Sequence, residues 1–68
     1  MSKDIGEIVR GFRLSLPGNV TQAQFGKLVE APASVISDIE NNKREPSKKV
    51  ASNLAKLTGK PIETFFRE

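Results

Sequence analysis

The residues with the clearest chemical potential lie in one run, from Ser34 to Ser47, with the sequence SVISDIENNKREPS. Two acids, Asp38 and Glu40, lie in its apolar-spaced first half, and the basic cluster KREPSKK overlaps its end. This cluster holds four cations against one acid, which suits contact with phosphates, although most charge runs are ordinary solvated surface. The four cations are Lys43, Arg44, Lys48 and Lys49.

Composition excludes most other chemistry. The 68-residue chain has no cysteine and no histidine, which removes disulfides, Cys/His zinc sites and His-based catalysis. No paired-carboxylate or phosphate-loop pattern is present, so we expect no enzyme, no cofactor and no metal. The net charge of +3 permits nucleic-acid binding without proving it. No apolar run approaches ~18 residues and no signal peptide is visible, which predicts a cytoplasmic protein without membrane contact.

Five short helices must position this run. Apolar residues recur at spacings of three and four, and turn or capping residues separate these stripes. Ser2, Thr21 and Ser47 have N-cap chemistry, and Gln24 completes a capping-box pattern with Thr21. Pro32 suits the start of a helix. The predicted helices span residues 3–16, 20–30, 32–41, 47–59 and 60–68.

Helices this short are marginal alone and must share one core. Gly26 costs about 1 kcal/mol relative to alanine inside a helix, but it fits where a neighbouring helix comes close. Two short helices joined by a tight turn describe a helix-turn-helix over about residues 21–42; the alternative is a generic five-helix bundle. The predicted core residues are Val9, Phe12, Phe25, Leu28, Ile36, Ile39, Val50, Leu54, Leu57, Ile62 and Phe65.

Four segments in order, IGEIVRGFR, VTQAQFGKLV, VISDIENNKREPS and LAKLTGKPIETFF, resemble the Cro/repressor-type (XRE-like) helix-turn-helix family. The resemblance covers Ile5 to Phe66. It implies an all-α, compact five-helix lambda-repressor-like fold in a single domain over residues 1–68. The departures fall in the turns, where Glu30 and Asn42 stand at positions that are usually glycine in the family.

The resemblance implies that the third helix lies in the DNA major groove. The residues expected to read bases are Ala33, Ser34, Val35, Ser37 and Asp38. Asp38 either accepts a hydrogen bond from a cytosine amino group or is held off the DNA and turned onto a nearby Lys or Arg. The residues expected to contact phosphate are Gln22, Lys27, Asn41, Lys43, Arg44, Lys48 and Lys49. The family also pairs the glutamate at Glu40 with the arginine at Arg13; the alternative is an exposed Glu40.

From this resemblance we expect a sequence-specific transcriptional regulator that binds double-stranded DNA, a small phage- or mobile-element-type repressor or Cro-like protein in a bacterial cytoplasm. One such domain reads few base pairs, so a homodimer on a pseudo-palindromic operator is expected. Its first candidate dimer surface is the fifth helix, with Ile62 and Phe66. Two alternatives stay open: an antitoxin with a protein partner, and a protein-interaction module that kept the fold without DNA binding.

Overall fold

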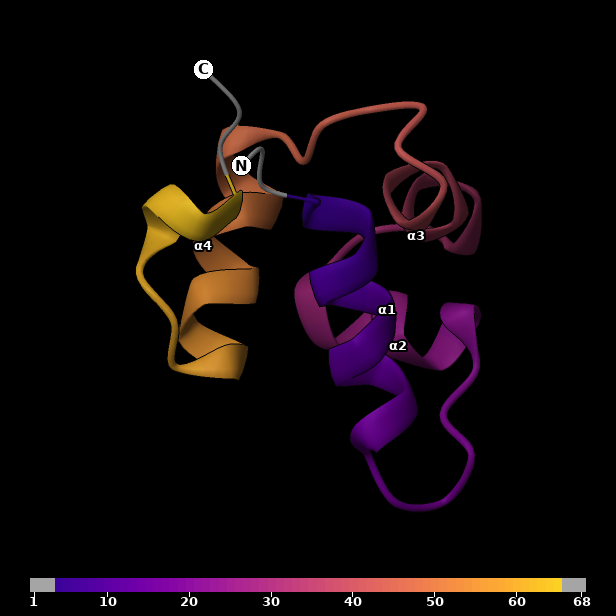
Figure 1. Ribbon diagram of the computed structural model, residues 1–68. Helices are drawn as coiled ribbons and strands as arrows, with labels where there is room; N and C mark the ends of the chain where they lie inside the picture. The colour runs from indigo at the N-terminus through magenta and orange to yellow at the C-terminus, as the bar shows by residue number, and fades with distance from the viewer. Residues whose placement is uncertain (1–3, 66–68) are drawn as a thin grey trace.

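Four α-helices and one short 3-10 helix build the computed structural model, which describes residues 4–65 (Figure 1). In Figure 1, α1 crosses the middle of the molecule, with α3 on one side and α4 on the other. The prediction of an all-helical fold holds over the described residues, where no strand occurs. The elements are α1 (Ile5–Ser15), α2 (Gln22–Val29), α3 (Ala33–Glu40), α4 (Lys48–Thr58) and η1 (Ile62–Phe65).

The fifth predicted helix is not confirmed as an α-helix within the described residues. The segment after α4 forms a single 3-10 turn, η1, in which the amide of Thr64 donates to the carbonyl of Pro61 at 2.9 Å. Gly59 ends α4 in the left-handed conformation with φ of 75°. Within residues 60–65 the chain adopts the tighter i→i+3 pattern, which is typical of short helical pieces. Phe66, the other predicted apolar residue of this segment, lies outside the described residues.

The helix N-termini are capped largely as their residue types predict. Thr21 and Gln24 form a capping box, with reciprocal hydrogen bonds of 3.1 and 2.9 Å. Ser47 accepts a hydrogen bond from an amide in the first turn of α4. The N-cap of α1 is Asp4, whereas the predicted cap, Ser2, lies outside the described residues. Each cap satisfies an amide that has no partner within its own helix.

The core gathers apolar side chains from every helix. Phe12, Leu57 and Ile62 are only partly buried against it. Leu28 was placed in the core wrongly, because α2 packs through Phe25, Gly26 and Val29, which leaves Leu28 53% exposed. The buried apolar residues are Ile5, Val9, Phe25, Val29, Ile36, Ile39, Val50, Ala51, Leu54 and Phe65.

Two glycines allow backbones to meet closely around α3. A Cβ atom on Gly26 would collide with the carbonyl oxygen of Ala31, in the turn between α2 and α3. A Cβ atom on Gly6 would lie 2.5 Å from the carbonyl oxygen of Glu40 and 2.6 Å from that of Ile39. α1 therefore rests directly on the last turn of α3, and α2 folds tightly back into α3.

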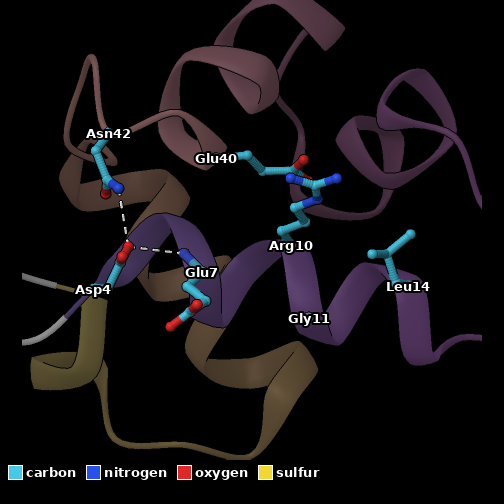
Figure 2. A pocket seen from close by; sticks show the side chains of 7 residues that line it. All are labelled: Asp4, Glu7, Arg10, Gly11, Leu14, Glu40 and Asn42. Atoms are coloured by element: carbon cyan, nitrogen blue, oxygen red, sulfur yellow. Dashed lines mark hydrogen bonds between the residues drawn. The ribbon is translucent and has the colours of Figure 1, made fainter.

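Asn42 ties the end of α3 to the start of α1. Its φ of 59° lies in the left-handed region, which asparagine tolerates better than most residues. Its Oδ1 accepts from the amide of Gly6 at 3.1 Å, and its Nδ2 donates to Oδ1 of Asp4 at 2.9 Å (Figure 2). The two side-chain contacts of Asn42 fix α3 against α1.

Glu30, at the other position where the family usually has glycine, is also left-handed, with φ of 62°.

Candidate nucleic-acid interface

α3 has an inner side and an outer side. Ile36 and Ile39 point into the core and are fully buried. Ser34 is exposed, and Ser37 and Asp38 are half-buried on the outer side. Ala33 and Val35, the other two predicted base-reading residues, are half-buried at its edges. The outer side is therefore lined mainly by short side chains that leave the helix surface open to a large partner.

Local contacts order the outer side. Asn41 donates from Nδ2 to the carbonyl of Ser37 at 2.9 Å and to its hydroxyl at 3.4 Å. Oδ2 of Asp38 lies 3.4 Å from Nη2 of Arg44, so this acid is turned onto an arginine. Ser34 makes no side-chain hydrogen bond with any described residue. Its hydroxyl therefore remains available as donor and acceptor.

Glu40 fastens the inner edge of α3 to α1. Its carboxylate accepts two hydrogen bonds from Arg13, at 2.7 Å from Nε and 3.1 Å from Nη2. The two side chains are 13% and 3% exposed, for Arg13 and Glu40 respectively. The hydrogen bond to Glu40 raises the pKa of Arg13 above its ordinary value, although burial acts in the opposite direction. Arg13 thus stays charged at every working pH.

The same carboxylate also holds the start of α2. Gln22 donates from Nε2 to Oε1 of Glu40 at 3.1 Å, and Arg13 donates to the carbonyl of Val20 at 2.9 Å. Gln22 was predicted to contact phosphate; the structure places its amide on Glu40, with the second N–H of that amide still free to donate. One buried acid therefore orients α1, the start of α2 and α3 together.

The basic cluster divides into paired and unpaired cations. Lys49 pairs with Glu30 at 3.1 Å, and both side chains are well exposed. Lys43 and Lys48 are exposed and make no ion pair with any residue from 4 to 65. Lys27 is also exposed, on α2. The unpaired lysines are the groups most ready to meet an external anion.

The loop after α3 folds back over the helix end. The amide of Lys43 donates to the carbonyl of Asp38 at 2.8 Å, and that of Asn42 to the carbonyl of Ile39 at 3.1 Å. Residues 42–45 line a small pocket of about 180 Å³. The loop is thus held at the last turn of α3, and its Arg44 reaches Asp38 on the outer side.

A larger pocket, of about 410 Å³, runs along the exposed side of α1 beside the end of α3 (Figure 2). The pocket is lined by Asp4, Glu7, Arg10, Gly11, Leu14, Glu40 and Asn42.

Two other kinds of site were not found in the described part of the chain. Among the residues from 4 to 65, no three His, Cys, Asp or Glu side chains are grouped to hold a metal ion. None of the described helices is both long and apolar enough to cross a membrane.

Sequence reasoning missed two anchoring asparagines. Asn42 was noted only for its tolerance of left-handed backbone, yet its side chain joins α3 to α1. Asn53 donates to the carbonyl of Val29 at 2.8 Å and so satisfies the end of α2 from α4. No local pattern marks Asn53, because its partner lies 24 positions away on another helix.

An all-helical domain in which two short helices meet through a tight turn, with the second helix open to solvent on one side, is a helix-turn-helix domain. A family model described as helix-turn-helix matches residues 9–65, most of the chain. The chain belongs to this Cro/XRE-like helix-turn-helix family, a class of DNA-binding transcription regulators. No curated protein and no solved structure matched the chain.

Proposed function

We propose that this protein is a sequence-specific regulator, a small repressor or Cro-like protein of phage or mobile-element type acting in a bacterial cytoplasm. It would read its operator through the outer side of α3. The observation that carries the proposal is the division of α3. Its inner side is fixed by Ile36, Ile39 and the Arg13–Glu40 pair, while its outer side is at least partly exposed and is followed along the chain by unpaired lysines.

Affinity in this proposal comes from the phosphates. Lys43 and Lys48 need break no ion pair within the described residues to contact DNA, whereas Lys49 has to exchange Glu30 for a phosphate. The free N–H of Gln22 and the amides at the start of α2 add neutral donors. Phosphate contacts of this kind fix the register of α3 without reading sequence. Lys27 and Asn41 complete the proposed set.

Specificity in this proposal comes from short side chains. Ser34 and Ser37 can donate to or accept from base edges, and Ala33 can contact a thymine methyl group. Val35 touches bases only with the part of its side chain that the core leaves exposed. Because these groups reach little beyond the helix surface, α3 has to lie deep in the groove.

The proposed active form is a homodimer on a pseudo-palindrome, since a single helix of this length reads few base pairs. Support for DNA binding over a pure protein-interaction role comes from Asp38. Its charge is offset by Arg44, at 3.4 Å, and so repels phosphates less than an isolated acid would. An antitoxin would carry the same DNA-binding surface together with a further partner.

Selection of bound sites from a random DNA pool tests this proposal. We expect enrichment of an inverted repeat with half-sites about one helical turn apart, or a multiple of it. An enriched single half-site would contradict the dimer but leave DNA reading intact. A pool without any enriched sequence, bound no better than unselected DNA, would overturn the proposal.

A further inference from the structure

The outer side of α3 lacks a side chain suited to guanine. Between Ala33 and Glu40 there is no Arg, Lys, Asn or Gln. Guanine is most often read by an arginine that donates to both O6 and N7 in the major groove. If α3 reads a G·C base pair strongly, the guanidinium has to come from another element.

The guanidinium that the structure holds against the outer side of α3 belongs to Arg44, in the loop after the helix. Two contacts hold the loop at the last turn of the helix: the amide of Lys43 donates to the carbonyl of Asp38, and Nη2 of Arg44 lies 3.4 Å from Oδ2 of Asp38. The loop is therefore attached to Asp38, on the outer side, by one backbone contact and one side-chain contact. The side chains of Arg44 and Asp38 remain 53% and 37% exposed, so a ligand can reach both from solvent.

We propose that Arg44 and Asp38 together read one G·C base pair in each half-site. Arg44 donates to O6 and N7 of the guanine, and Asp38 accepts from the amino group of the cytosine. The major-groove edge of this base pair presents two acceptors beside one donor, and the ion pair presents donors beside an acceptor. This inference rests on the proposed function, because it requires α3 to lie in the major groove.

Charge alone would place Arg44 on a phosphate, and the pairing argues against that. Movement of Arg44 to the backbone would leave Asp38 facing DNA without its cation, an arrangement that costs binding energy. On the base edge the arginine keeps its contact with Asp38 and still has free N–H donors. The Lys49–Glu30 pair differs from the Arg44–Asp38 pair in this respect. A lysine ammonium lacks the planar fork with which a guanidinium can donate to O6 and N7 of one guanine.

The test compares Arg44→Ala with the matched control Lys43→Ala on the selected operator. For each protein, Kd is measured on the operator and on duplexes in which each G·C pair is replaced by A·T. The wild type is expected to lose about 10- to 100-fold in affinity at one position of each half-site. Arg44→Ala should lose the preference at that position only. Lys43→Ala should weaken binding to all duplexes equally and keep the preference.

A second probe reports on the guanine atom itself. Replacement of that guanine by 7-deazaguanine removes the N7 acceptor, which should weaken the wild type and leave Arg44→Ala unaffected. Asp38→Ala should reduce the preference for the G·C pair without abolishing binding to random DNA. Should Arg44→Ala weaken every duplex equally, as Lys43→Ala does, Arg44 is a phosphate contact and this inference is overturned while the proposed function stands. A wild type without any sequence preference would overturn both.

Discussion

Two ion pairs meet on α3 from opposite sides. Arg13–Glu40 is almost completely buried, bidentate and 2.7 Å long at its shorter contact. Arg44–Asp38 is half exposed and has a single contact of 3.4 Å. The first joins separate helices through residues 27 positions apart, and the second joins a helix to the loop that directly follows it.

The two pairs differ in what they can do: the buried pair holds helices together, and the exposed pair can change partners. A buried pair is costly to disrupt, because the loss of one partner leaves a charge without water or counter-ion. An exposed pair contributes little to stability and can exchange its partners with a ligand. α3 thus carries one acid that is buried in the fold and, two residues before it in the sequence, one acid that stays partly exposed to solvent.

The largest expected effect is on the inner pair. Arg13→Ala and Glu40→Ala should each lower the free energy of unfolding by about 3–5 kcal/mol, since each leaves a buried charge unpaired. The double variant should cost less than the sum. Urea unfolding followed by circular dichroism measures all three, and Glu40→Gln gives a milder change if the alanine variants do not fold.

Asp38→Ala is the matched control for the outer pair, and its stability should change by at most about 1 kcal/mol. If Asp38→Ala destabilises the fold as much as Glu40→Ala, the contrast between the two pairs does not exist. Strict additivity in the Arg13/Glu40 cycle would show that these side chains are not coupled.

The next effect concerns the contact between α1 and the inner side of α3. Gly6→Ala should lower stability by about 1–3 kcal/mol, because its Cβ would press on the carbonyls that end α3. Gly11→Ala, in the same helix with open space around it, should raise stability by up to about 1 kcal/mol. Thermal unfolding of both variants gives the comparison. Equal effects of the two substitutions would show that α1 does not contact the end of α3 at Gly6.

A smaller effect is expected for the lysines beside the outer side. Lys43→Ala combined with Lys48→Ala should reduce the log–log salt slope of DNA binding by up to about 1.8, since each phosphate contact contributes about 0.9. Lys56→Ala is the control, because Lys56 belongs to the last turn of α4, at the end away from α3 (Figure 1). Fluorescence anisotropy between 50 and 200 mM salt measures the slopes, over a range in which such slopes are resolved. A slope that the double variant leaves unchanged would mean that these lysines face solvent in the complex.

The smallest effect is expected for the serines. Ser34→Ala should relax the preference at one base position by about 0.5–1.5 kcal/mol, the worth of one hydrogen bond. Ser37→Ala should do less, because its hydroxyl already lies within reach of Asn41. Binding to random DNA should hardly change for either variant, and competition with single-substituted operators gives the values. A larger loss for Ser37→Ala would show that Asn41 releases this hydroxyl on DNA.

Short-range sequence rules predicted the features that depend only on a few neighbouring residues. The capping box of Thr21 and Gln24 and the glycine stop at Gly59 were readable because both act within a few residues of chain. Leu28 was misplaced because Leu28 and Val29 are adjacent apolar residues, and only the packing of α2 against its neighbours decides which one is buried. The α-helical form of the fifth helix was not confirmed for a similar reason, since a single turn has no strong preference of its own.

The candidate site divides in the same way. The partnership of Arg13 and Glu40 was expected only from the family resemblance, since no local spacing connects residues so far apart. The sequence left two fates open for Asp38, and the loop geometry selects the contact with Arg44 in the free protein. No sequence pattern revealed that Gln22 also donates a hydrogen bond to Glu40, because this contact exists only once α1, α2 and α3 have assembled.

The two-sided build of α3 has a consequence for how such proteins diversify. Ser34, Ser37 and Asp38 carry no part of the core, so a mutation there leaves the fold almost untouched. Under the proposed function, such mutations would change the operator preference one side chain at a time, without a loss of stability that a second mutation would have to restore. Glu40 allows no such drift, because three elements depend on its carboxylate.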